Sequence, residues 1–100
     1  MKRIYIAGKI GDLDPDVFIG NFQDAKTELI EDLGFKEIEI VSPLDLPHNH
    51  KRSWSDYMRE DIQALMSCSH IYALRNWRQS PGATIEVNLA VQIGINIIFQ

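Results

Sequence analysis

Two carboxylates and a phenol stand at positions from which the fold could bring them together. Tyr5 lies in the first short apolar run, Asp61 in a segment of helical periodicity, and Glu86 near the start of another such segment. A glycosidic bond can be cleaved when one carboxylate attacks or stabilises the anomeric carbon while another group protonates the leaving group. These three residues are therefore the candidate catalytic set, provided that they surround one cavity.

The segment that contains Glu86 begins with strong helix-start signals. Ser80 is a suitable N-cap, and Pro81 occupies the first helical position. The expected apolar stripe of this helix consists of Ile85, Leu89 and Ile93, with Ala90 beside it. Glu86 then lies at the edge of the buried face, and its side chain leans back toward the preceding turn. An acid early in a helix also complements the helix dipole, by about 0.3–1 kcal/mol, so position alone leaves both interpretations open.

Apolar runs and segments of helical periodicity alternate along the chain. Strands are expected at residues 4–8, 37–41, 71–74 and 95–99. Helices are expected to begin near residues 14, 53–55 and 80, with Gly34 ending the first and Gly94 ending the last. This alternation predicts an α/β fold: a three-layer, flavodoxin- or Rossmann-like parallel sheet of about four strands in the order 2-1-3-4, with helices on both faces.

The two outer strands differ in their patterns. The segment 37–41 alternates polar and apolar residues, which is typical of a strand that is wet on one side. We therefore place it at a sheet edge. The segment 95–99 is almost continuously apolar, which is typical of a parallel strand covered on both faces.

The loops after the first and third strands flank the point where the predicted strand order reverses, and ligands bind in such crevices. Candidate substrate-binding residues in and just after these loops are Gly8, Lys9, Trp77, Ser80, Gly82 and Ala83. The backbone N–H groups at the helix start, including those of Gly82 and Ala83, could hold a phosphate together with Lys9. The alternative is that Ser80 only caps the helix and that Lys9 is solvated.

Composition indicates a single domain that spans residues 1–100. The chain has 45% hydrophobic and 24% charged residues and a formal net charge of −4, with its lysines and arginines scattered. These values disfavour duplex nucleic acid and acidic membranes as partners. The sequence has no recognisable signal peptide or membrane span, and its single cysteine, Cys68, fits a reducing cytosol. We therefore expect a cytoplasmic protein.

We expect neither a cofactor nor a metal ion. The glycine-rich dinucleotide fingerprint and the Walker lysine loop are both absent from the sequence. His48 and His50 lie in a polar loop without a nearby cysteine or acidic pair, so they are weak candidates for metal ligands. Cys68, near a helix end, is better explained as a small apolar residue than as a nucleophile.

Five short motifs, taken together, resemble one protein family. They are Ile4-Tyr5-Ile6-Ala7-Gly8, Asn21-Phe22-x-x-Ala25, Ser42-Pro43-x-x-Leu46, Trp54-x-x-Tyr57-Met58-x-x-Asp61 and Ser80-x-Gly82-Ala83-x-x-Glu86. The motifs cover essentially the whole chain. They resemble those of the small DUF4406-type domains, often encoded by phages, that are similar to nucleoside 2-deoxyribosyltransferases.

The resemblance implies a role for each member of the candidate catalytic set. Glu86 matches the family's nucleophile, which lies in the first turns of the helix after the third strand. Tyr5 matches the tyrosine that orients this glutamate. Asp61 matches an aspartate that contacts the base or assists protonation of the leaving group. The implied partner is a small molecule, a 2′-deoxynucleoside or its 5′-monophosphate.

Ser80 departs from the transferase pattern. Six residues before the glutamate, the transferases carry an aspartate that binds the deoxyribose, whereas related 2′-deoxynucleoside 5′-monophosphate N-glycosidases carry a serine that serves the phosphate. The resemblance therefore favours hydrolysis of a nucleotide over transfer. The alternative is a non-catalytic nucleotide-binding or interaction module on the same fold.

We also expect a homodimer or a larger homo-oligomer. A domain of this size buries a limited core, and Trp54, Trp77 and the apolar helix faces offer more hydrophobic surface than one sheet needs. The family resemblance implies the same.

Overall fold

The computed structural model describes residues 2–47 and 53–100. Its strands are β1 (Ile4–Ala7), β2 (Ile40–Val41), β3 (His70–Ala73) and β4 (Asn96–Phe99), and its α-helices are α1 (Pro15–Glu31), α2 (Trp54–Met66) and α3 (Pro81–Ile93). Three short 3-10 helices lie between them: η1 (Glu37–Glu39), η2 (Pro43–Asp45) and η3 (Trp77–Gln79). None of the helices in the described ranges is long and apolar enough to cross a bilayer.

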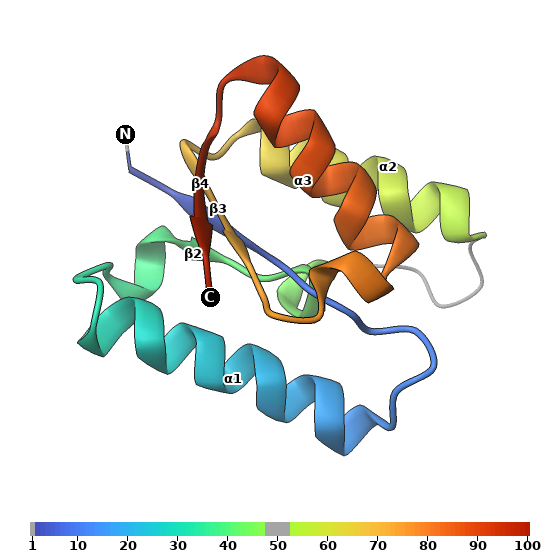
Figure 1. The fold of residues 1–100 in the computed structure, drawn as a ribbon, viewed down its shortest axis with the longest axis horizontal. Coiled ribbons are helices and arrows are strands. Elements are labelled where there is room, and N and C mark those ends of the chain that lie inside the picture. Colours follow the sequence, from blue (N-terminus) through green and yellow to red (C-terminus); the bar gives the residue numbers. More distant parts are fainter. Residues whose placement is uncertain (1, 48–52) are drawn as a thin grey trace.

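The four strands form one parallel sheet in the order β2-β1-β3-β4 (Figure 1). In its register, Tyr5 of β1 lies opposite Ile71 of β3, and Ala7 lies opposite Ala73. The α/β class, the strand order and the placement of the second strand at an edge are therefore confirmed.

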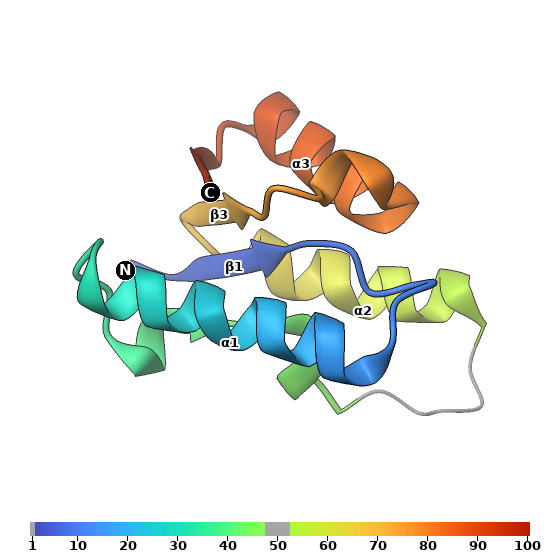
Figure 2. The same cartoon turned by 60° about the horizontal axis from the view of Figure 1, so that its bottom comes forward.

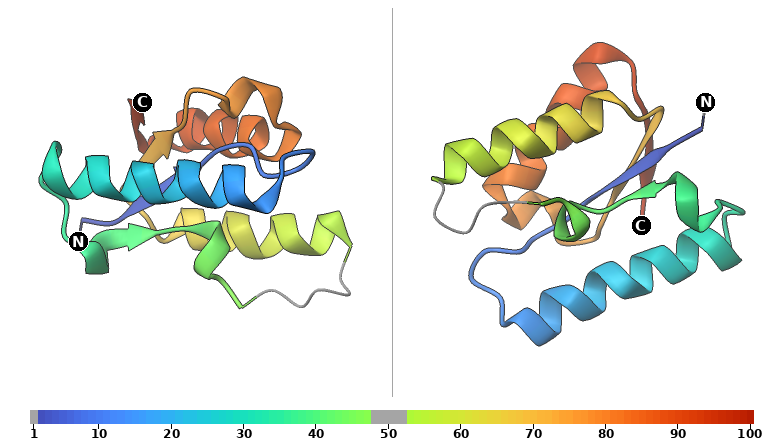
Figure 3. Two further views of the ribbon diagram at one scale, coloured as in Figure 1. Left: turned by 90° about the horizontal axis from the view of Figure 1, so that it is seen from below. Right: turned by 180° about the vertical axis from the view of Figure 1, so that it is seen from behind.

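Helices cover both faces of the sheet. Helix α1 lies alone on one face, and α2 and α3 lie together on the other (Figure 3, right). Figure 2 shows β1 and β3 side by side between α1 and α3. Side chains alternate across the sheet, so β1 sends Ile4 and Ile6 to the α1 side and Tyr5 and Ala7 to the α2/α3 side. The three-layer prediction is confirmed.

The second strand is much shorter than its alternating sequence predicts. Residues 37–39 form the 3-10 helix η1, and only Ile40 and Val41 pair with β1. The Lys36 backbone N–H donates to the Glu39 carboxylate at 2.7 Å, and this local bond closes a turn where a strand would need ladder bonds. Ile38 is consequently 88% exposed.

The continuous apolar pattern of the last strand predicts more burial than the strand has. Strand β4 is the other edge of the sheet, and Phe99 at its end is 59% exposed. Only its two middle residues are half-buried, Ile97 against the α2/α3 side and Ile98 against the α1 side. An edge strand can therefore carry an apolar run when its middle residues contact both cores.

The buried face of α3 also differs from the predicted stripe. Ile85 and Ile93 are 42% and 45% exposed, so they do not form the core face. The buried residues of this helix are Ala83, Glu86, Val87 and Ala90, which follow the i, i+3, i+4, i+7 spacing of one helix face. Two of them are alanines, so the helix packs closely on the sheet, and Glu86 lies within its contact face.

Candidate active site

A cavity of about 780 Å³ opens at the carboxyl ends of β1 and β3. Its walls come from Tyr5, from Phe18 and from four further segments, within residues 8–12, 43–47, 54–61 and 79–86. Figure 1 shows the loop after β1 and the first turn of α3 on the same side of the sheet. This position is the crevice at which open parallel sheets bind ligands.

Tyr5 and Glu86 form a buried pair at the inner wall of this cavity. The Tyr5 hydroxyl donates a hydrogen bond to Glu86 Oε2 at 2.5 Å and so joins β1 to α3. Tyr5 is fully buried, and Glu86 is 5% exposed. Both residues line the cavity, so the small exposed part of the carboxyl group is accessible to a ligand.

The environment of this pair shifts the pKa of both groups. Burial raises the pKa of Glu86 to about 8, and the negative charge of Asp61 adds to the rise, while the hydrogen bond from Tyr5 opposes it. Burial, followed by the charges of Glu86 and Asp61, raises the pKa of the Tyr5 phenol above its ordinary value. A strongly shifted carboxyl group in a cleft is typical of a functional site.

Asp61 approaches the pair from α2. Ser53 caps this helix: its hydroxyl accepts from the Asp56 N–H at 3.3 Å. Met58 is buried, and Asp61, three residues later, lies on the same side of the helix and lines the cavity. The three candidate catalytic residues, from three different elements, therefore meet at one cavity.

The start of α3 forms a second part of the wall. The Ser80 hydroxyl accepts from the Ala83 N–H at 3.1 Å. The expectation that the Ala83 N–H is a free donor is therefore wrong, because the cap occupies it. Within residues 2–47 and 53–100, no acceptor is present for the Gly82 N–H or for the hydroxyl hydrogen of Ser80. Those two donors remain available at the cavity.

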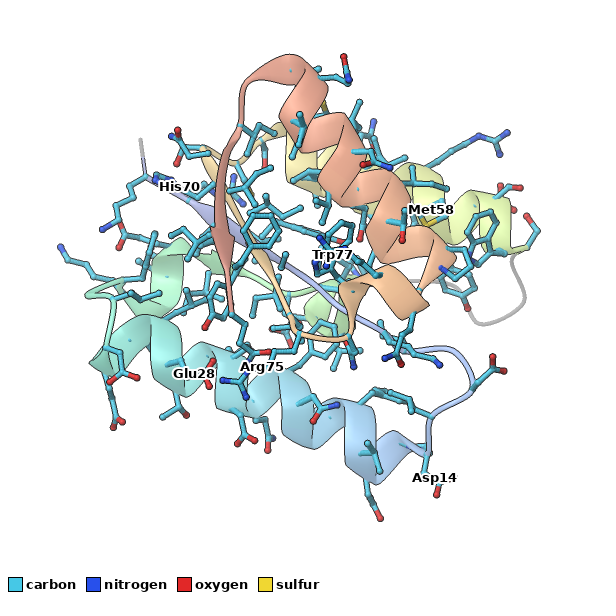
Figure 4. The ribbon with its side chains drawn as sticks, viewed as in Figure 1. Asp14, Glu28, Met58, His70, Arg75 and Trp77 are labelled. Carbon is cyan, nitrogen blue, oxygen red and sulfur yellow. The ribbon has the colours of Figure 1, made fainter. Side chains whose placement is uncertain are left out.

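Two glycines allow close approaches around the cavity. A Cβ atom on Gly8 would lie 2.5 Å from Leu74 Cδ1, so the loop after β1 can pass over Leu74 only with glycine at this position. A Cβ atom on Gly82 would lie 3.1 Å from Met58 Sδ, so α3 approaches α2 closely at its first turn. Figure 4 labels Met58, which lies between these two helices.

Lys9 lies in the loop after β1. Its backbone N–H donates to Asn76 Oδ1 at 3.0 Å, and the residue lines the cavity. Among the described residues that line the cavity, it is the only cation, beside the acids Asp12, Asp61 and Glu86.

Trp77 does not line the cavity. It packs against the α2/α3-side core and against Phe99, with ring centroids 6.1 Å apart, and the Arg78 guanidinium lies 4.9 Å from its ring centroid. Figure 4 shows it between the strands and α3. The position of Trp77 therefore gives no support to the predicted binding role and suits a packing role instead.

An apolar and aromatic wall faces the polar residues, and the sequence analysis assigned no binding role to it. Its main members are Phe18, Leu44, Leu46, Trp54, Tyr57 and Met58. Flat aromatic side chains are suitable surfaces for a nucleobase. Trp54 and Tyr57 belong to the same motif as Asp61, which is the signal that could have identified them.

The described residues contain no group of three histidine, cysteine or acidic side chains able to hold a metal ion. His48 and His50, the weak metal candidates, lie outside the described residues. The cavity residues that could contact an anionic ligand are Lys9, Ser80 and Gly82.

The chain has the α/β fold of a solved deoxyribosyltransferase. The solved structure of a 2-desoxiribosyltransferase from Leishmania mexicana is similar, with a TM-score of 0.64 and 21% sequence identity. The match covers 99% of this chain and 63% of that one, so the chain spans less than two thirds of the transferase. The family model described as "Domain of unknown function (DUF4406)" matches residues 2–99, and the chain belongs to this family. No curated protein matches the sequence.

Proposed function

We propose that the protein cleaves or transfers at the N-glycosidic bond of a 2′-deoxynucleoside or its 5′-monophosphate, with Glu86 as the nucleophile. The observation that carries this proposal is the buried Tyr5–Glu86 pair, with Asp61 close by, at the inner wall of an accessible cavity. The similarity in fold to a 2-desoxiribosyltransferase supports the same conclusion.

The reaction proceeds by two displacements at the anomeric carbon C1′. The ionised Glu86 attacks C1′, the C1′–N bond breaks, and the base leaves with the bonding electrons and takes a proton from the Asp61 carboxyl group. The product is a 2-deoxyribosyl ester of Glu86. Water, or a second base, then attacks C1′, releases the Glu86 carboxylate and gives up a proton to Asp61.

Tyr5 serves the nucleophile in two ways. Its hydrogen bond at 2.5 Å fixes Oε2 of Glu86, so the other oxygen can face C1′. The same bond lowers the pKa of Glu86 and favours the ionised form that attack requires. Because burial still raises this pKa to about 8, kcat/KM should increase with pH up to that region as Glu86 ionises.

A 5′-phosphate would fit beside the first turn of α3. The Gly82 N–H and the Ser80 hydroxyl offer two donors, and the Lys9 ammonium adds a charge-assisted contact. A serine six residues before Glu86 supports this assignment, because an aspartate at that position would repel the phosphate. A titration that compares a deoxynucleoside with its 5′-monophosphate tests it. Equal affinities, unchanged by Ser80→Ala or Lys9→Ala, would rule the phosphate contact out.

The decisive experiment is base release from a panel of 2′-deoxynucleosides and their 5′-monophosphates, followed by chromatography. We expect at least one substrate to release its base and Glu86→Ala to abolish the release. Intact mass after an acid quench should show a deoxyribosyl adduct on the wild type and none on Glu86→Ala. Near-wild-type release by Glu86→Ala would reject the nucleophile. Tight binding by the whole panel without base release would instead indicate a non-catalytic nucleotide-binding module.

We also infer a homodimer or larger homo-oligomer. Several large apolar side chains of the α2/α3 side and of β4 are exposed in the single chain: Trp54, Met66, Ile85, Val91, Ile93 and Phe99. Exposed apolar surface of this kind favours self-association. Sedimentation at micromolar concentration tests the inference, and a single 11.5 kDa species would contradict it.

A further inference from the structure

Asn76 connects the two loops that flank the cavity. The last bond between the strand ends runs from the Leu74 N–H to the Ala7 carbonyl, at 2.9 Å. Beyond this bond the two segments of the chain separate. The segment after β1 enters the loop before α1, and the segment after β3 enters η3. At this point the Asn76 side chain connects the two segments, because its Oδ1 accepts from the Lys9 N–H at 3.0 Å. A side-chain amide thus extends the pairing of β1 and β3 by one more link.

The other contacts of Asn76 fix its own position. Its carbonyl accepts from the Gln79 N–H at 3.0 Å, which closes the η3 turn, and the turn leads directly to Ser80. The side chain is half-buried. The Asn76 amide is therefore attached to the same short segment that carries the N-cap of α3.

The position of the Lys9 backbone depends on the hydrogen bond to Asn76 more than the position of Gly8 does. Gly8 is held by its close approach to Leu74, whereas Asn76 Oδ1 is the only partner that the described residues give the Lys9 N–H. Asn76 itself does not line the cavity, but Lys9 does. The Asn76 side chain can therefore act on a ligand through the Lys9 loop that it holds.

We propose that Asn76 is a positioning residue that holds the Lys9 loop against the start of α3, so that the Lys9 ammonium and the Ser80 hydroxyl face the same anionic group of the substrate. This inference rests on the proposed function, specifically on its phosphate contact. It deepens that function by naming the residue that sets the distance between the cation and the helix start.

Amide hydrogen exchange tests the tether without any need for activity. In Asn76→Ala, the Lys9 N–H loses its acceptor, and we expect its exchange to accelerate about tenfold or more, while amides in the sheet keep their protection. Asn76→Asp retains an acceptor oxygen and should restore protection of Lys9. Asn88→Ala, at an exposed asparagine on α3, is the matched control and should leave the Lys9 amide unchanged. Unaltered exchange of Lys9 in Asn76→Ala would overturn the proposal.

A double-mutant cycle tests whether the tether acts through the Lys9 charge. Dissociation constants for a 2′-deoxynucleoside 5′-monophosphate and for the matching nucleoside are measured in Asn76→Ala, Lys9→Ala and the double variant. We expect Asn76→Ala to weaken binding of the monophosphate about three- to tenfold and binding of the nucleoside by less than twofold, with kcat nearly unchanged. In the Lys9→Ala background, Asn76→Ala should have no further effect.

The two failures are distinguishable. Additive losses in the cycle, or equal weakening of nucleoside and monophosphate, would mean that Asn76 only stabilises the loop, and the proposal would be rejected while the proposed function stands. If the wild type itself fails to prefer the monophosphate, the phosphate contact fails and the positioning role fails with it. The exchange rates of Lys9 would then still report whether the tether exists.

Discussion

Ile4 and Ile6 point toward α1, whereas Tyr5 and Ala7, their neighbours along β1, point toward α2 and α3. The α1-side core is built from large side chains, namely Ile4, Ile6, Phe22, Leu29, Phe35, Tyr72 and Leu74, with Ala25. The α2/α3-side core contains Ala7, Ala73, Ala83 and Ala90 at the places where α3 meets the sheet. The large side chains of the α1-side core serve stability. The alanines of the α2/α3-side core let α3 approach the sheet closely, so that a carboxyl group lies close to the strands.

The largest expected effect is on the rate of base release, when Glu86 on the α2/α3 side is substituted. Glu86→Gln keeps the shape of the side chain and can still accept from Tyr5, but it cannot attack C1′. We expect base release to fall at least roughly 10³-fold while the variant stays folded. The measurement is single-turnover base release, with circular dichroism as the folding check. Glu31→Gln, at an exposed position of α1, is the matched control and should retain full activity.

On the α1 side, a core substitution should lower the free energy of unfolding and leave the rate of base release unchanged. Leu29 is fully buried on α1, so Leu29→Ala should lower the free energy of unfolding by about 2–5 kcal/mol. The rate of base release per folded molecule should stay at the wild-type value, because Leu29 itself does not line the cavity. Urea unfolding and active-site titration separate the two quantities. A loss of rate per folded molecule comparable to that of Glu86→Gln would break the comparison.

Glu86 should also make the stability of the wild type depend on pH. Its folded pKa is raised from 4.5 to about 8, so the native state holds more protons than the unfolded chain between these values. The free energy of unfolding should therefore fall as pH rises from about 4.5 to about 8, by a few kcal/mol in order of magnitude, and then level off.

Glu86→Gln removes that dependence. The variant should be more stable than the wild type at pH 8, and the difference should shrink toward pH 5. Thermal unfolding at four pH values between 5 and 8.5 provides the check. Parallel stability curves for the two proteins would contradict the assigned burial of an ionisable group.

The smallest predicted effect concerns the phenol. Tyr5→Phe removes the hydrogen bond that lowers the pKa of Glu86, so this pKa should rise further. The ascending limb of the kcat/KM profile should move to higher pH by the same amount, with a smaller loss of rate above it. Tyr72→Phe, which removes the hydroxyl bonded to Glu28 on the α1 side, is the matched control and should leave the profile in place.

The sequence contained most of the fold and most of the site, for identifiable reasons. Apolar runs alternating with capped helices determine a parallel sheet, and the Ser80-Pro81 start and the Gly94 end of α3 appear where local rules predict them. Tyr5, Asp61 and Glu86 line one cavity, which lies at the crevice where the order of the parallel strands reverses.

The errors have physical causes as well. In α3, the large residues Ile85 and Ile93 fit the apolar stripe that helical spacing predicts. The face that contacts the sheet instead consists of Ala83, Glu86, Val87 and Ala90, because the two alanines let the helix approach closely. Trp77, a predicted binding residue, is not among the cavity-lining residues, and its ring packs near Phe99 of the edge strand. Local patterns show which face of an element is apolar but not how closely its neighbour approaches.

The hydrogen bond between Tyr5 and Glu86 spans 81 residues of sequence, from the first strand to the last helix. Neither residue can meet the other until β3 has paired with β1 and α3 has docked on both, so the pair is among the last features that synthesis can complete. A ribosome-bound or proteolysed chain that lacks α3 still carries Tyr5, most of the strands and the cap of α2, but it lacks Glu86, the proposed nucleophile. If Glu86 acts as proposed, base release can begin only after α3 has docked on the sheet, so its onset during refolding would report the completion of the whole domain.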